Sequence, residues 1–171
     1  MHTRKAILPD ASQIHDLILH YSQDGTLLPR TMSELCENVR DFLVVEDGGT
    51  IIACGALHLY GSHLTEVRSI AVHPDHKGEG AGRLLIDALL VEAEHHRVQC
   101  VCLFTRIPEF FSRFGFSVAK RESLPDKIYK DCINCPKLHA CDEVAMVRGE
   151  IPDYSVLGDS HVFVPLSKFS A

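Results

Sequence analysis

Residues 66–86, EVRSIAVHPDHKGEGAGRLLI, decide how this chain folds. An apolar strand ends at Val72, His73-Pro74-Asp75 breaks it, and a glycine-rich turn opens a helix with a broad apolar stripe. Glycines let the main chain approach a ligand, and the N–H groups of a first helical turn attract anions together with the helix dipole. The stretch therefore predicts a pyrophosphate site, with a purely structural tight turn as the alternative.

Strand and helix signals on either side of this stretch predict one domain of the α/β (α+β) class. The pattern favours a mixed central sheet of about six to seven strands, flanked by about four helices. The helix after the glycine turn is a crossover, so the strands before and after it are expected to be parallel neighbours. The expected strands are residues 4–8, 42–45, 51–60, 66–72, 100–105, 115–120 and 144–147. One helix is expected after Pro9-Asp10, a second from Thr31 or Ser33 to Arg40, a third from the glycine turn to His95-His96, and a fourth over residues 108–114.

The domain is expected to occupy residues 1–149. Within it, residues 122–142 are interpreted as a loop-like, cysteine-rich insertion. Residues 150–171 are interpreted as a C-terminal extension with one more candidate strand at 162–164. Such a strand could pair with a second copy of the chain, so a homodimer stays open beside a monomer.

Composition and charge limit the kinds of partner. With 171 residues, 46% of them apolar, the chain suits a single globular domain. Its formal net charge of −6 argues against nucleic acid as the main partner. The sequence offers neither a run of about 18 apolar residues nor the apolar core of a signal peptide. We therefore expect a cytoplasmic protein that binds no membrane and keeps its cysteines mostly reduced.

Two motifs give the chain a family resemblance. Residues 77–82, KGEGAG, lack the Gly-Lys-Ser/Thr of a P-loop, and too little chain follows for a doubly wound dinucleotide domain. The run instead resembles the acetyl-CoA motif of the GCN5-related N-acetyltransferases, with Lys77 in place of the usual Arg or Gln, followed by Gly80 and Gly82. The run PEFFSRFGF at 108–116 resembles the second signature of that family. The likeness spans about residues 4–149.

The resemblance implies acetyl-CoA as co-substrate and suggests where it binds. The main chain of Ile70, Ala71 and Val72 would pair with the pantetheine arm like an added strand, with the thioester oxygen near the Val72 N–H group. Phe110, Phe111 and Arg113 would line the CoA side of the cleft. The pyrophosphate would lie on Lys77, Gly78, Glu79, Gly80, Ala81, Gly82 and Arg83.

Three further stretches narrow the resemblance to short, stand-alone bacterial N-acetylglutamate synthases. They are GTLLPRTMSEL at 25–35, ACGALHLY at 53–60 and DKIYKDCINCPKLHACDEVAM at 126–146. This likeness implies acetyl transfer to the α-amine of L-glutamate, a step of arginine biosynthesis. The small-molecule partners would then be acetyl-CoA and L-glutamate or a similar amine.

Catalysis needs a base for the amine and a donor for the oxyanion. The likeness places Glu66 at the general base, with an exposed strand carboxylate as the alternative. Many relatives use a tyrosine as acid where this chain has Phe111, so that role is vacant. Thr105, at the end of its strand, is a candidate hydroxyl donor, although a side chain that caps the local backbone is an equal alternative.

The two carboxylates of glutamate favour arginine as a partner. By the likeness, Arg30 matches the substrate arginine. Arg68 shares a strand face with Glu66 by the period-two rule, and Arg106 follows Thr105 at the rim of the expected site. For each of the three, a solvated surface arginine is the competing interpretation.

The cysteine-rich insertion has the ligand types of a structural zinc site. Cys132, Cys135, His139 and Cys141 would supply four ligands at close spacing. A second Cys-x2-Cys pair is missing, so the cysteines could instead pack against the fold or sense the redox state.

Three functions compete on this evidence. The first is an N-acetylglutamate synthase. The second keeps the fold but takes glutamine or another amine. The third is a non-catalytic sensor of acetyl-CoA together with a metal or redox signal, which the vacant tyrosine position favours.

Overall fold

In the computed structural model, which describes residues 1–157, the glycine-rich turn joins strand β4 (Thr65–Val72) to helix α3 (Ala81–His95). A single 3-10 turn at Pro74–His76 separates the strand from the glycines. The chain divides into two compact units. Of the described residues, the first holds 1–58 and 66–96, and the second holds 59–65 and 97–157.

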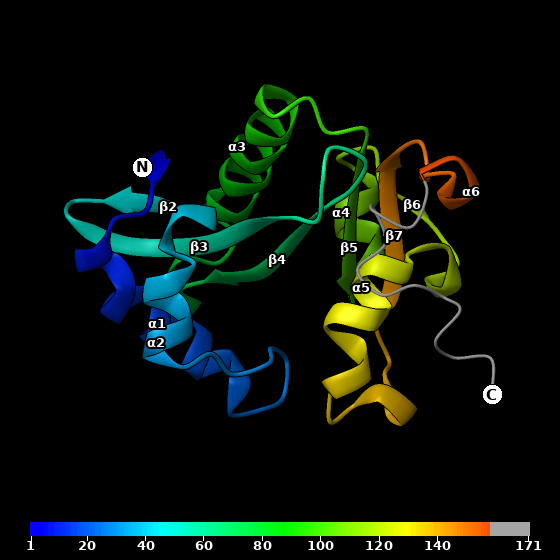
Figure 1. Cartoon of the computed structure of the whole chain (residues 1–171). Helices are drawn as coiled ribbons and strands as arrows, with labels where there is room; N and C mark the ends of the chain where they lie inside the picture. Colours follow the sequence, from blue (N-terminus) through cyan, green and yellow to red (C-terminus); the bar gives the residue numbers. More distant parts are fainter. Residues whose placement is uncertain (158–171) are drawn as a thin grey trace. The chain divides into compact units, whose positions relative to one another are not determined.

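The first unit is built on four strands in the order β1-β2-β3-β4 (Figure 1). Strands β1 (His2–Lys5), β2 (Phe42–Asp47) and β3 (Thr50–Leu59) form two antiparallel pairs, with Arg4 opposite Val44 and Phe42 opposite Ala56. The first strand is earlier than predicted because Pro9 starts a 3-10 turn at Leu8–Asp10, which ends the extended backbone.

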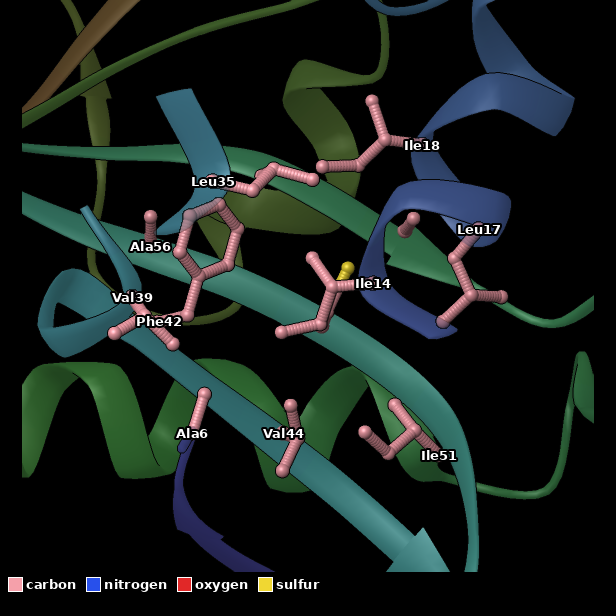
Figure 2. Close-up of a cluster of buried hydrophobic side chains, with 12 residues drawn as sticks. Ala6, Ile14, Leu17, Ile18, Leu35, Val39, Phe42, Val44, Ile51 and Ala56 are labelled. Carbon is pink, nitrogen blue, oxygen red and sulfur yellow. The ribbon is translucent and has the colours of Figure 1, made fainter. Parts of the chain in front are cut away.

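The core of the first unit lies between its strands and the two N-terminal helices. Helix α1 (Ala11–Ser22) contributes Ile14 and Ile18, and α2 (Met32–Glu37) contributes Leu35. Figure 2 shows these side chains over the strands, where alternate residues such as Phe42 and Val44 point toward them. Helix α2 begins at the predicted cap Thr31, whose hydroxyl accepts a bond from the Glu34 N–H group, but it ends three residues before Arg40.

Helix α3 also packs against the sheet of the first unit. A side chain at Gly55 of β3 would lie 3.1 Å from Cδ1 of Leu89 and 3.2 Å from Cδ2 of Leu85. Both leucines belong to α3 and are fully buried. Gly55 therefore allows the helix that carries the glycine turn to lie close to the strand.

The second unit is built on three strands in the order β5-β7-β6. Strands β5 (Cys100–Thr105) and β7 (Val144–Gly149) pair antiparallel along their whole length, and β6 (Ser117–Val118) pairs with β7. The strand predicted at 115–120 is therefore only two residues long. Gly115 has a φ of +82°, and both residues of β6 are exposed, so little burial extends this strand.

The predicted loop at 122–142 is wrong in part. It contains helix α5 (Pro125–Lys130) and 3-10 turns at Cys132–Asn134 and Leu138–Ala140. The remaining helices of this unit are α4 (Pro108–Ser112) and α6 (Tyr154–Leu157), so the described residues hold six helices rather than about four. The strand predicted at 162–164 lies outside the described residues. No helix among residues 1–157 is both long and apolar enough to cross a membrane.

Candidate active site

The glycine turn presents main-chain N–H groups at the start of α3. The first hydrogen bond of the helix runs from the Leu84 N–H to the carbonyl of Gly80 at 2.9 Å. The N–H groups of Ala81, Gly82 and Arg83 precede that bond and so are the ones a helix leaves to an outside acceptor. Gly78 and Gly80 adopt φ values of +85° and +92°, which an L side chain rarely takes. This conformation suits an anion held by main-chain donors.

Charged side chains of the turn and of the start of α3 form ion pairs with neighbouring residues. His76 Nδ1 lies 2.8 Å from Glu79 Oε2, and Arg83 Nε lies 3.7 Å from Asp87 Oδ2 on exposed surface. The His76 contact draws the Glu79 carboxylate, which repels a phosphate, toward a neighbouring ring. Lys77, in the position of the family's Arg or Gln, places its Nζ atom 5.0 Å from the centroid of the Tyr21 ring.

Tyr21 links two parts of the predicted acetyl-CoA site. Its hydroxyl donates a hydrogen bond of 2.5 Å to the carbonyl of Val72, at the end of β4, while its ring lies against Lys77. Three residues earlier, Ser69 has a φ of +54°, so β4 is irregular before it ends. Sequence reasoning missed Tyr21, because its partner is 51 residues away and only the helical spacing of α1 could place it on the inner face.

Glu66 and Arg68 form a charged pair on β4. The Glu66 side chain is 3% exposed and the Arg68 side chain 14%, and Arg68 Nη1 lies 3.9 Å from Glu66 Oε2. The period-two prediction that they share a strand face agrees with this contact. Glu66 is buried, so the alternative of an exposed strand carboxylate is wrong.

The charges of Arg30 and Arg68 act on the same carboxyl group, that of Glu34. The pKa of Glu34 is lowered, chiefly because its carboxylate accepts a hydrogen bond from the Thr31 N–H, and the charges of Arg30 and Arg68 add to the effect. Arg30 itself is half-buried, just before the start of α2. Two of the three predicted substrate arginines thus act on the pKa of one carboxyl group, although 38 positions (68 less 30) separate them in the chain.

The remaining predicted site residues belong to the second unit. The Thr105 side chain is buried, and its Oγ1 accepts a bond of 3.0 Å from the Ile107 N–H, which is the capping role named as its alternative. Arg106 Nε bonds to Asp142 Oδ2 at 2.8 Å, an interaction that raises the pKa of Arg106. The rim arginine is therefore paired with a carboxylate from the cysteine-rich insertion.

The phenylalanines of the second signature pack against one another in a cluster and do not all line an open surface. Phe111 is 4% exposed and packs edge-on against Phe110 and Phe116, at centroid distances of 5.0 and 6.2 Å. Phe110 is half-buried and Arg113 is exposed. Of the three residues that the resemblance places on the CoA side of the cleft, Phe111 is therefore packed inside the cluster, while Phe110 and Arg113 are more exposed.

The zinc prediction finds no support. Within residues 1–157, no three His, Cys, Asp or Glu side chains come together in a way that could hold a metal ion. Cys132, Cys135 and Cys141 are half-buried thiols, and His139 is exposed. The four residues are close in sequence, but the 3-10 turns at Cys132–Asn134 and Leu138–Ala140 do not gather them around one point.

Comparison with known proteins decides the family. A family model described as an acetyltransferase (GNAT) domain matches residues 38–118. The chain is also 39% identical over 145 residues to an uncharacterised N-acetyltransferase of Chlorobaculum tepidum, covering 85% of this chain and 94% of that protein. The chain belongs to the GNAT family of N-acetyltransferases. The predicted family, fold class and enzyme class are thereby confirmed.

Other relatives carry more specific names. An amino-acid acetyltransferase of Mycobacterium tuberculosis is 37% identical over 117 residues, which is 67% of each chain. An amino-acid acetyltransferase of Pasteurella multocida is 31% identical over 126 residues, and the match spans 72% of this chain but only 29% of that protein. The match to the Pasteurella multocida protein therefore covers less than a third of that protein.

Solved structures of the same fold contain CoA. A Mycobacterium tuberculosis protein in complex with CoA and NLQ superposes with a TM-score of 0.76 at 29% identity, covering 88% of this chain and 99% of that one. The N-acetylglutamate synthase of Neisseria gonorrhoeae, complexed with coenzyme A and N-acetyl-glutamate, gives a TM-score of 0.78 at 24% identity over 85% of this chain and 34% of that one. At that identity the second likeness establishes the fold alone.

Proposed function

We propose that this GNAT enzyme transfers the acetyl group of acetyl-CoA to the α-amine of L-glutamate. The observation that carries the proposal is the buried Glu66 carboxylate on β4, with the partly buried Arg68 3.9 Å from it. The charge of Arg30, like that of Arg68, lowers the pKa of Glu34. A carboxylate and two guanidinium groups match an acceptor that must lose a proton and that carries two carboxylates. The amino-acid acetyltransferases among the relatives support the same acceptor class.

Acetyl-CoA would bind along the end of β4 and the start of α3. The main-chain N–H groups of Ala81, Gly82 and Arg83 would take the pyrophosphate, since an N-terminal helical turn favours an anion. The main chain of Ile70, Ala71 and Val72 would pair with the pantetheine arm as an added strand. The Val72 N–H group would then support the oxyanion that forms at the thioester carbon.

Glutamate would be held by its carboxylates. Arg30 and Arg68 come from separate segments, so each can serve one carboxylate, and an arginine can bind it through two parallel hydrogen bonds. Arg68 must then share its charge between the substrate and Glu66, which lies 3.9 Å from it. This contact would help to keep the Glu66 carboxylate in place beside the amine.

The transfer itself needs one proton acceptor and one leaving group. Glu66 would take a proton from the ammonium group, directly or through one water, and the free amine would attack the thioester carbon. Collapse of the tetrahedral intermediate would release the CoA thiolate, a fair leaving group without an acid because a thiol is far more acidic than an alcohol. The phenylalanine at 111 is compatible with such a mechanism.

An acceptor screen tests the proposal. Purified protein is mixed with acetyl-CoA and each amino acid in turn, and free thiol release is followed. L-Glutamate is expected to give the highest kcat/KM, with N-acetylglutamate found by mass spectrometry. A preference for glutamine or a polyamine would overturn glutamate as the acceptor. A failure of every acceptor to increase thiol release would overturn acetyl transfer itself.

A further inference from the structure

Two cysteines of the insertion lie one turn apart. Cys132 begins the 3-10 turn Cys132–Asn134, and the N–H group of Cys135 donates to the carbonyl of Cys132 at 3.0 Å. A turn closed by such a bond keeps the Cα atoms of residues i and i+3 less than about 7 Å apart. Disulfides join Cα atoms at about 4.4–6.8 Å, so the pair is within bonding reach.

The segment around the pair is fixed to the rest of its unit. Helix α5, just before it, holds Asp126, whose carboxylate contacts His63 Nε2 at 2.8 Å and accepts from the Tyr154 hydroxyl at 2.9 Å; His63 and Asp126 are both 2% exposed. Asp131, next to Cys132, accepts from the Tyr60 hydroxyl at 2.8 Å and pairs with Lys127 at 3.1 Å. These contacts anchor α5 and the residue that precedes Cys132 within the second unit.

The pair differs from the buried cysteines of the chain. Burial raises the pKa of the Cys54 thiol to about 12 and that of Cys100 to about 11, and Cys102 is also fully buried. Thiols of that kind react slowly, because the thiolate is the nucleophile. Cys132 and Cys135 are both partly exposed residues, unlike those three cysteines.

We propose that Cys132 and Cys135 form a reversible disulfide, a redox modification site separate from the acetyl-transfer chemistry. The oxidant is a small-molecule disulfide. One protein thiolate attacks a sulfur of that disulfide and displaces the first small thiol, which leaves a mixed disulfide. The second cysteine then attacks the protein sulfur and releases the second small thiol, so the protein loses two hydrogens and the oxidant gains them.

The expected product is a short-range disulfide within one turn. A cross-link across four residues removes little entropy from the unfolded chain, so global stability should change little. The bond does fix the turn that joins α5 to the rest of the insertion. Reduction by a dithiol would restore both thiols.

The test uses the full chain and glutathione disulfide as the probe. The protein is equilibrated in buffers with graded ratios of glutathione disulfide to glutathione, quenched with acid, alkylated and mapped by peptide mass spectrometry. Alkylation is expected to be lost at Cys132 and Cys135 together, with no glutathione left on either residue. The peptide that holds Cys132 and Cys135 should lose about 2 Da, the mass of two hydrogens.

Variants separate this pair from the other thiols. Cys132→Ser and Cys135→Ser should each abolish the intramolecular bond and leave a mixed disulfide with glutathione on the remaining cysteine. Cys36→Ser, which removes an exposed thiol on α2, should leave the bond intact. A disulfide to Cys141, a pair that stays fully alkylated in the most oxidising buffer, or one equivalent of zinc lost in Cys132→Ser would each overturn the proposal. None of these outcomes depends on the acceptor of the enzyme.

Discussion

Glu66 is 2% exposed and lies beside Arg68, on the strand that leads into the glycine turn. At the scale of single residues, an ionisable pair is seldom buried in this way unless its partners or its chemistry require it. Arg30 is the second residue on which the proposed function depends, and its charge lowers the pKa of Glu34 together with that of Arg68. These are the residues at which single substitutions are most informative.

Arg30→Ala is expected to raise the KM for L-glutamate about 10- to 100-fold. A hydrogen bond to a charged group contributes about 1.5–3 kcal/mol, and 1.4 kcal/mol is tenfold in affinity. The KM for acetyl-CoA should not change. Arg40→Ala is the matched control, because Arg40 is an exposed arginine nearby in the chain and outside the proposed site. Equal effects of the two substitutions would refute the assignment of Arg30.

Tyr21→Phe removes the hydroxyl that donates to Val72 but keeps the ring beside Lys77. The end of β4 then loses one anchor worth about 1 kcal/mol, so the Kd for CoA should rise about fivefold. Calorimetric titration with CoA measures the change, and the KM for glutamate should move less. An unchanged Kd would mean that Tyr21 does not position the CoA-binding strand.

At the scale of elements, the glycine turn and its flanking strand and helix could be predicted because their signals are local. Glycine, proline and the apolar periodicity all lie within residues 66–86. Helix α5 could not be predicted, because it is six residues long and is held by His63, which lies 63 positions from Asp126. The aromatic signature was placed correctly at α4, but the burial of Phe111 depends on packing with Phe116.

Gly80→Ala is expected to weaken CoA binding at least tenfold. Alanine at a φ of +92° costs about 1–2 kcal/mol, and its methyl group would stand where the main chain must meet a phosphate. Gly48→Ala carries a similar strain at a φ of +56° in the β2–β3 turn, with nothing within 4 Å in either case. Both variants should lose similar stability in urea, while only the first should lose CoA affinity. Equal CoA affinity in both would contradict a main-chain cradle at residues 77–83.

At the scale of the whole molecule, stability against acid depends on charge pairs such as Arg4 with Asp10. The Arg4 guanidinium donates to the Asp10 carboxylate at 2.6 and 2.9 Å and so lowers the pKa of Asp10. A lowered carboxyl pKa stabilises the fold above the unfolded value of about 3.9, and this contribution is lost as the pH falls through the folded pKa.

Asp10→Asn should therefore lower the free energy of unfolding at pH 7 by about 1–3 kcal/mol. The variant should also lose less stability than the wild type as the pH falls below about 4. Urea unfolding at graded pH measures both effects. Asp16→Asn, whose side chain is 79% exposed on α1, should leave the curve almost unchanged. If the free energy of unfolding of Asp10→Asn falls with pH as steeply as that of the wild type, the Arg4–Asp10 pair does not determine stability in acid.

The most direct test of the proposed chemistry is the steady-state release of CoA from acetyl-CoA with L-glutamate, in the wild type and in Glu66→Gln. Loss of a general base should lower kcat by about 10²- to 10⁴-fold, while the Kd for CoA stays close to that of the wild type. A Glu66→Gln enzyme that acetylates glutamate at the wild-type rate would contradict the account.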